Sequence, residues 1–208
     1  YASGPHLAFA DVHVAQGGVL LVHGPSGAGK STWLALAAGL LPATQGGITV
    51  AAQVLSALRG AALDAWRGRN IGFLPQRLHL SPHLSVARNM ALAQFAAGVP
   101  QDLQVISRTL DALGVDDLAQ RMPAQISGGQ ALRVALARAV LLQPKVILAD
   151  EPSASLDDDT CRDALGLLHR TAQQFGATLV IATHDTRVGQ HFSSNSGLQR
   201  LEILRKQL

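Results

Sequence analysis

The 208-residue sequence predicts an α/β fold: a parallel sheet with helices on both faces, a helical insertion and a small N-terminal β region. Three observations support this prediction. Short apolar runs alternate with longer helical segments along most of the chain. A glycine-rich loop joins one buried strand to the helix after it. Residues 77–143 contain no convincing strand, which indicates a helical insertion between two parts of the sheet.

The strands are identified by apolar or alternating side chains. Residues 7–14 alternate loosely and predict a strand of the small N-terminal β region, which the sequence Gln16-Gly17-Gly18 ends. The unbroken apolar character of residues 19–23 is typical of a strand buried on both faces. The remaining strands are predicted at residues 48–51, 71–74, 146–149 and 178–183.

The helices are identified by their length and by the residues that stop them. Pro42 and Pro144 follow two helical segments, and Gly98, Gly114 and Gly176 follow the other three. Both residue types are suited to helix ends. The predicted helices cover residues 32–41, 84–97, 103–113, 131–142 and 162–175.

The composition fits a single globular domain in a reducing compartment. Apolar residues make up 48% of the chain and charged residues 15%, which provides material for a core. The net charge of +3, without a dense Lys or Arg run, does not single out nucleic acid as a partner. The single Cys161 cannot form an internal disulfide. No segment approaches the ~20 consecutive apolar residues of a membrane span.

A phosphate-binding loop is predicted after the strand at residues 19–23. Glycines let backbone N–H groups turn toward an anion, and the following helix points its positive end at the same place. Lys30 can reach the outer phosphates, and the Ser31 hydroxyl can ligate Mg²⁺. The alternative is a flexible surface turn, which the flanking strand and helix disfavour. The loop reads Gly24-Pro25-Ser26-Gly27-Ala28-Gly29-Lys30-Ser31, and Thr32 follows it.

Two acids follow the apolar strand at residues 146–149. A carboxylate beside the phosphate loop can hold Mg²⁺ through water, and a second one can polarise an attacking water. We assign Asp150 to the metal and Glu151 to the water. The alternative is a pair of solvated acids in the turn before Pro152, and the two acids alone do not decide between these interpretations.

A second candidate phosphate site opens the helix at residues 131–142. Ser127 with Gln130 three residues later fits a capping box, which is a structural role. The same hydroxyl, with the backbone N–H groups at Gly128 and Gly129, can also bind an anion. Because one helix start is already committed to the nucleotide, this one would address a phosphate from another side.

Gln76 and His184 each follow a predicted strand. The carboxyl ends of parallel strands meet at the edge of the sheet where ligands bind, so both side chains are expected there. Each residue taken alone is a weak signal, because a Gln or His after a strand is more often an ordinary loop residue.

Together these elements resemble the ATP-binding domain of an ABC transporter, over nearly the whole chain. The resemblance implies a P-loop NTPase core at residues 1–76 and 144–208 and an inserted helical subdomain at residues 77–143. Residues 66–73 and 84–89 resemble the branch that contains lipoprotein-release, macrolide-export and cell-division ATPases. The matching motifs are the phosphate loop at residues 24–31, the Q-loop Gln76, the signature Ile126-Ser127-Gly128-Gly129-Gln130, the Walker B strand at residues 146–150 with Glu151, the D-loop Ser155-Leu156-Asp157 and the H-loop His184.

The resemblance implies a role for each matching residue. Glu151 would be the general base, His184 would contact the γ-phosphate, and Gln76 would sense Mg²⁺ and the attacking water. Lys30 would grip the β- and γ-phosphates of ATP, with the other residues of the loop and Thr32 around the phosphates. Mg²⁺ would be held by Ser31, Asp150 and Gln76.

The remaining site residues are implied by a dimer. The family forms head-to-tail dimers of identical or different subunits, with two ATP molecules at the interface. Residues of the signature, Ser127, Gly128, Gly129 and Gln130, together with Asp157 of the D-loop, would contact nucleotide across that interface. Tyr1 is the best-placed candidate to stack on adenine.

The resemblance also implies a peripheral location at the cytoplasmic face of the cell membrane, bound to integral-membrane permease subunits. The helical insertion near residues 77–90 would transmit motion to the permease, and no nucleic acid is expected as a partner. Three features depart from the family pattern: Ile126 replaces leucine, Pro75 stands where this branch often has an aromatic residue, and the strand expected ahead of Tyr1 lies outside the sequence. The cargo and the direction of transport cannot be read from the chain.

The sequence disfavours two other functions. Soluble ABC-type ATPases that act on DNA or ribosomes separate the Q-loop and the signature by long insertions, or fuse two ATPase domains, whereas 50 residues separate Gln76 from Ser127 here. A binding module that has lost catalysis is disfavoured because Lys30, Glu151 and His184 are all present.

Overall fold

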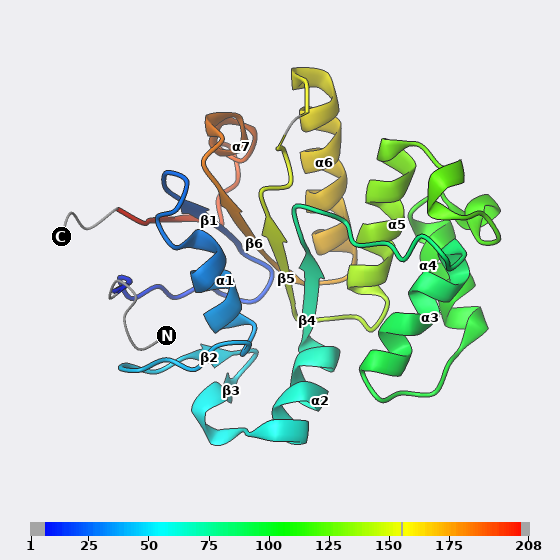
Figure 1. The fold of residues 1–208 in the computed structure, drawn as a ribbon. Helices are drawn as coiled ribbons and strands as arrows, with labels where there is room; N and C mark the ends of the chain where they lie inside the picture. The colour runs from blue at the N-terminus through cyan, green and yellow to red at the C-terminus, as the bar shows by residue number, and fades with distance from the viewer. Residues whose placement is uncertain (1–6, 155, 205–208) are drawn as a thin grey trace.

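A five-stranded parallel sheet lies at the centre of the computed structural model, which describes residues 7–154 and 156–204 (Figure 1). The strand order is β4-β5-β6-β1-β7. The five strands are β1 (Val19–His23), β4 (Ile71–Leu74), β5 (Val146–Asp150), β6 (Thr178–Thr183) and β7 (Leu198–Glu202). A separate antiparallel hairpin consists of β2 (Thr49–Val50) and β3 (Gln53–Val54).

The register brings four strand ends to one edge of the sheet. His23 of β1 aligns with Thr183 of β6, and Ala149 of β5 aligns with Leu74 of β4. The loops that follow these four strands therefore leave the sheet at the same edge, which is where parallel sheets bind ligands.

Helices cover both faces of the sheet, as predicted. Residues of β1 alternate between two buried clusters: Leu20 packs with Leu34 of the first helix, and Leu21 packs in the cluster that contains Leu136 and Leu165. The helices are α1 (Lys30–Ala37), α2 (Gly60–Asn70), α3 (Val86–Ala96), α4 (Leu103–Ala112), α5 (Gly128–Val140), α6 (Asp158–Gln174) and α7 (Thr186–His191). Short 3₁₀ turns lie at Leu55–Ala57, Asp116–Leu118 and Pro123–Gln125.

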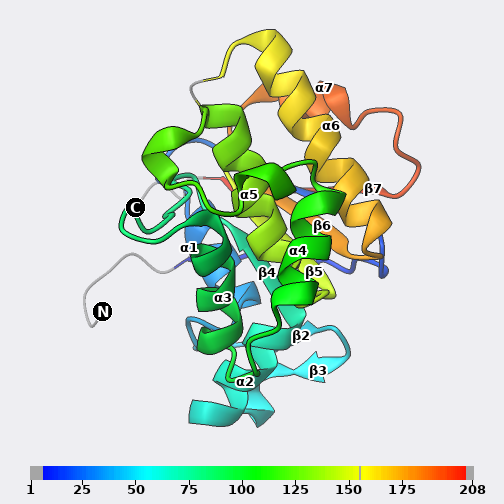
Figure 2. The ribbon, with the colours of Figure 1, turned by 90° about the vertical axis from the view of Figure 1, so that its right-hand side faces the viewer.

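The helical insertion is confirmed in the described chain. Between β4 and β5 the chain forms α3, α4 and α5 with two 3₁₀ turns and no strand. These helices lie beside the β4 edge of the sheet (Figure 1). They pack against one another, as the view along that edge shows (Figure 2). Gly98 and Gly114 follow α3 and α4 with φ of 67° and 66°, which confirms them as helix stops.

The predicted strand at residues 7–14 is not formed. Both edges of β1 are already paired, with β6 on one side and β7 on the other, so this segment has no edge of β1 to join. Its apolar side chains still contribute to the core, because Phe9 and Val14 pack against the cluster on the α1 face. The alternating pattern therefore reflects side-chain packing and not the pairing of a strand.

Four elements were missed by sequence reasoning or found only in part. The strand predicted at residues 48–51 is the first arm of the β2–β3 hairpin, whose turn has positive φ at both Ala51 and Ala52. Alanine at such positions gives no turn signal, unlike the usual Asn-Gly. Helix α2 has no buried residue, α7 is short, and β7 buries only Leu201, so their apolar patterns are weak. In the part of the chain that is described, no helix combines the length and apolarity that a membrane crossing requires.

Candidate functional site

The glycine-rich loop leaves β1 and enters α1 at Lys30. Gly29 has φ of 105°, a left-handed conformation that L side chains rarely adopt. A Cβ on Gly24 would collide with the carbonyl oxygen of Ile203, just beyond β7. The path of the loop therefore requires glycine at these two positions, and the predicted order of strand, loop and helix is confirmed.

Lys30 is buried and points back into its own loop. Its Nζ donates hydrogen bonds to the carbonyl oxygens of Gly24 (2.9 Å) and Pro25 (3.2 Å). The same Nζ lies 3.2 Å from Oε1 of Glu151, at the end of β5. The lysine thus joins the phosphate loop to the predicted general base.

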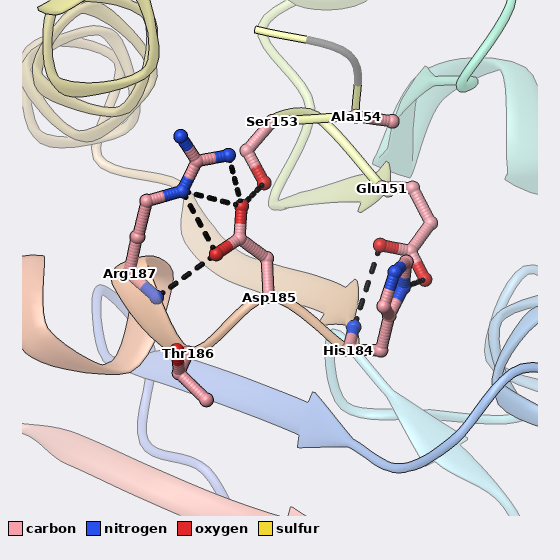
Figure 3. A pocket seen from close by; sticks show the side chains of 7 residues that line it. All are labelled: Glu151, Ser153, Ala154, His184, Asp185, Thr186 and Arg187. Carbon is pink, nitrogen blue, oxygen red and sulfur yellow. Dashed lines mark hydrogen bonds and ion pairs between the residues drawn. The ribbon is translucent and has the colours of Figure 1, made fainter. Parts of the chain in front are cut away.

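Glu151 lies at the centre of a hydrogen-bond cluster. Oε1 contacts Nδ1 of His184 at 2.8 Å, and Oε2 accepts a hydrogen bond from the hydroxyl of Thr183 at 2.9 Å. Figure 3 shows the carboxylate and the imidazole facing each other. Burial alone would raise the pKa of Glu151, but hydrogen bonds from His184, Thr183 and Lys30 outweigh it and leave the pKa below its ordinary value. The carboxylate is therefore ionised at neutral pH, and both of its oxygens have hydrogen-bond partners.

Glu151 also has an uncommon backbone conformation. Its φ is 47°, in the left-handed region that a residue with a Cβ rarely occupies. Its backbone N–H donates to the carbonyl oxygen of Ala182 in β6 at 2.8 Å. Strain of this kind persists where the surroundings fix the residue, and it is common at functional sites.

Asp150 and Ser31 form a separate pair beside this cluster. The Ser31 hydroxyl donates to Oδ2 of Asp150 at 2.9 Å, whereas Oδ1 is buried without a hydrogen-bond partner. Burial raises the pKa of Asp150, against the lowering effect of the Ser31 hydrogen bond. An orphaned carboxylate oxygen next to a serine hydroxyl fits a magnesium ion, which takes few protein ligands and completes its shell with phosphates and water. No group of three or more His, Cys, Asp or Glu side chains suited to a metal occurs in the described residues.

Gln76 lies at the same edge of the sheet. It is exposed and follows the end of β4 by two residues, just as Glu151 follows Ala149 in the neighbouring strand. Its proposed contacts with Mg²⁺ and water stay a prediction. Thr32 lies in the first turn of α1, beside Ser31. Tyr1 and Ser155 lie outside the described residues.

The signature opens α5, with Ser127 as the N-cap of the helix. The Ser127 hydroxyl accepts the N–H of Gln130 at 3.2 Å, and the Gln130 side chain accepts the N–H of Ser127 at 2.9 Å, which confirms the capping box. A Cβ added to Gly128 or Gly129 would meet no atom within 4 Å. The first turn of α5 therefore presents an open face.

Asp157 caps the next helix, α6. Its Oδ1 accepts the backbone N–H groups of Asp159 (3.1 Å) and Thr160 (3.0 Å), and its Oδ2 accepts the Thr160 hydroxyl. The backbone hydrogen bond from Thr160 is the main cause that lowers the pKa of Asp157. In one chain the residue has a structural role, and its contact with nucleotide stays a prediction.

Sequence reasoning missed several polar residues of the site. A recess of about 340 Å³ lies beside the Glu151–His184 pair, and Figure 3 shows polar side chains around it. Asp185 and Arg187 line it, and Thr183 hydrogen-bonds to its Glu151. The available signal was the polar sequence Thr183-His184-Asp185, which follows an apolar strand. The lining residues are Glu151, Ser153, Ala154, His184, Asp185, Thr186 and Arg187.

Comparison with known proteins places these features in one family. The family model described as ABC transporter matches residues 7–154. The lipoprotein-releasing system ATP-binding protein LolD of Bacteroides fragilis (strain YCH46) is 38% identical over 177 residues, which cover 84% of this chain and 82% of LolD. The sn-glycerol-3-phosphate import ATP-binding protein UgpC of Chromohalobacter salexigens is 41% identical over 177 residues, but this chain spans only 46% of its length.

Similar solved structures belong to the same family as the relatives found by sequence. The dimeric structure of MJ0796, a bacterial ABC transporter cassette, superposes with a TM-score of 0.79 and 28% identity, covering 100% of this chain and 93% of that one. A dimeric post-hydrolysis state of the ATP-binding cassette MJ0796 bound to ADP and Pi gives 0.75 and 30%, covering 92% and 85%. The matched region includes the phosphate loop, the capping box at Ser127, and the acids Asp150 and Glu151 at the end of β5. The chain therefore belongs to the ABC transporter family and is one of its ATP-hydrolysing, ATP-binding cassettes.

Proposed function

We propose that the chain is the ATP-binding subunit of a transporter, which hydrolyses ATP between two head-to-tail cassettes and drives transport through a permease. The observation that most supports this proposal is the convergence at one edge of the sheet of Lys30, Glu151 and His184 with the Ser31–Asp150 pair. The phosphate loop would bind ATP, and the two acids would supply the base and the metal ligand.

In this scheme the incoming γ-phosphate competes with Glu151 for its two partners. Lys30 and His184 both contact Oε1 of Glu151. Phosphate oxygens are strong charge-assisted acceptors and would draw Lys30 and His184 toward the nucleotide. Oε1 would then be free to accept a proton from the attacking water, which is the task of a general base.

Ser31 and Asp150 would hold Mg²⁺, and Gln76 at the same edge would contact the ion and the attacking water. The ion, when bound, would offset negative charge on the β- and γ-phosphate oxygens. Within the chain, the Ser31 hydroxyl would turn from Oδ2 of Asp150 toward the ion, and the orphaned Oδ1 of Asp150 would gain a partner.

The open first turn of α5 would bind the nucleotide of a second copy. The backbone N–H groups at Gly128 and Gly129, the Ser127 hydroxyl and the positive end of α5 suit a phosphate. Gln130 would shape this turn through the capping box, and Asp157 would contact the interface beside it. ATP would hold the two copies together, and loss of the γ-phosphate would release them.

The names of the relatives leave the cargo open. They include a lipoprotein-releasing system, a macrolide exporter and an sn-glycerol-3-phosphate importer, at identities between 35% and 41%. We therefore propose a peripheral position at the cytoplasmic face of the membrane without naming the cargo. The segment at residues 77–90, between Gln76 and α3, would carry movement to the permease.

The substitution Glu151→Gln tests the base. The variant should bind ATP, dimerise and hydrolyse ATP at least ~100-fold more slowly, because loss of a general base typically costs 10²–10⁴-fold. Phosphate release measures hydrolysis, and light scattering with ATP present measures ATP-dependent dimerisation. Glu202→Gln, an exposed position at the end of β7, is the matched control. Near-normal turnover in Glu151→Gln would remove Glu151 from its role.

A mixing experiment tests the head-to-tail dimer. Lys30→Ala and Gly129→Val should each be inactive alone. In a mixed dimer, one of the two sites combines the intact phosphate loop of one copy with the intact signature of the other. An equal mixture should therefore recover up to about a quarter of wild-type turnover. No recovery, with dimers present, would contradict the shared site.

A further inference from the structure

Arg187, in the first turn of α7, joins two loops that are far apart in the sequence. Its Nη1 donates to the carbonyl oxygen of Leu156 (3.1 Å) and lies 2.7 Å from Oδ1 of Asp158. Its Nε and Nη2 hold the carboxylate of Asp185, with the shortest contact at 2.8 Å. One guanidinium thus connects the turn before α6 to the loop that carries His184. Figure 3 shows its contacts with Asp185.

Asp185 is fixed from a second side. The hydroxyl of Ser153, which is fully buried, donates to Oδ2 of Asp185 at 2.8 Å. The hydrogen bonds from Arg187 are the main cause that lowers the pKa of Asp185 to about 2, and they outweigh the opposing effect of burial. Asp185 is therefore a permanent negative charge that Arg187 can bind in the bidentate manner of a planar guanidinium.

The network reaches the predicted base through Thr183. The backbone N–H of Asp185 donates to the Thr183 hydroxyl at 3.0 Å, and that hydroxyl donates to Oε2 of Glu151 at 2.9 Å. A shift of Asp185 would therefore change the direction of the Thr183 hydroxyl and, through it, the position of the Glu151 carboxylate.

We propose that Arg187 is a positioning residue, which fixes the loop of His184 against the turn at residues 156–158 and thereby holds Glu151 in its reactive orientation. This inference rests on the proposed function of Glu151. It adds a route by which the turn before α6, which would meet the second copy, affects the base without touching nucleotide. Lysine could not replace this arginine, because one ammonium cannot span Asp185, Leu156 and Asp158.

The variants Arg187→Ala and Arg187→Lys test the proposal. Arg187→Ala should lower kcat about tenfold or more, since small displacements of reacting groups cost up to ~100-fold. The KM for ATP should change little. The melting temperature should fall, because Asp185 loses the partner that lowers its pKa, so kcat is compared at a temperature where both proteins are fully folded. Because Asp185 would no longer fix the direction of the Thr183 hydroxyl, the loss should appear in kcat and not in KM. Arg187→Lys should recover little of the rate.

Two controls make the result specific. Arg162→Ala removes an exposed arginine that pairs with Asp159 in the first turns of α6, and it should leave kcat and the KM for ATP unchanged. Asp158→Asn removes one arm of the network, and its effect on kcat should be smaller than additive when combined with Arg187→Ala.

Unchanged kcat in Arg187→Ala would overturn the proposal. So would a loss of rate that merely follows a loss of ATP binding or of folded protein at the assay temperature, because that pattern indicates a general structural role. Failure of the proposed function is distinct: it would appear as normal turnover in Glu151→Gln, whatever the rate of Arg187→Ala.

Discussion

The substitution Gly129→Ala should raise stability and lower activity at the same time. Gly129 is helical, and a Cβ added there would meet no atom within 4 Å. Glycine inside a helix is less stable than alanine by about 0.5–1 kcal/mol, and a first-turn position favours the lower value. We therefore expect the free energy of unfolding to rise by about 0.5 kcal/mol, and the melting temperature by about 1–2 °C for a chain of this size.

The effect on turnover should have the opposite sign. The added methyl group would stand on the open face of α5, where the proposed phosphate of the second copy must approach a backbone N–H closely. Loss of one hydrogen bond to a charged group costs about 1.5–3 kcal/mol. ATP turnover should therefore fall by about 10- to 100-fold.

Gly189→Ala in α7 is the matched control, because its Cβ would also meet nothing within 4 Å. It should be stabilising like Gly129→Ala but keep wild-type turnover. Differential scanning fluorimetry and phosphate release, at protein concentrations that allow dimers to form, measure both properties. Turnover of Gly129→Ala within twofold of wild type would refute the idea that this helix start faces nucleotide. A lower melting temperature would contradict the inference that the first turn of α5 has room for a side chain at Gly129.

Three further outcomes are expected. Lys30→Ala should abolish tight ATP binding in a direct titration, and unchanged affinity would contradict its role. Asn89→Ala should destabilise the fold by about 2–4 kcal/mol in urea unfolding, because buried Asn89 accepts the N–H of Ser81 and donates to three carbonyl groups; Asn70→Ala, with its single bond to a helical carbonyl, should cost less than about 1.5 kcal/mol. Since the pKa of Asp185 is lowered to about 2, its stabilising contribution is complete above about pH 4 and is lost as the pH falls toward 2. The urea midpoint should fall over this range, and Asp185→Asn should show a smaller slope.

The central sheet could be predicted because its strands are buried on both faces. The apolar runs of β5 and β6 need no partner to be recognised, and β6 occupies the predicted residues Thr178–Thr183. Strand β7 could not be found in this way. It is an edge strand with only Leu201 buried, and its pairing with β1 is decided by the fold as a whole.

The candidate site could be predicted by residue type but not by contact. A lysine in the loop and acids after a strand indicate phosphate and metal chemistry wherever they occur. That Lys30 contacts Glu151, and that Thr183 supports it, follows from the register of β1, β5 and β6 and cannot be read from spacing. Arg187 was missed for the same reason, because its partners lie on another loop.

The charge balance around Glu151 explains why nucleotide and base activity should depend on each other. The carboxylate offsets the charge of buried Lys30 and hydrogen-bonds to His184. Bound ATP would bring negative charge to the same Nζ, so the phosphate and Glu151 would compete for one cation and repel each other. Glu151→Gln removes that repulsion along with the base. The same substitution should therefore strengthen ATP binding while it slows hydrolysis, and a variant that loses both properties would show that Glu151 organises the loop and does not act on water.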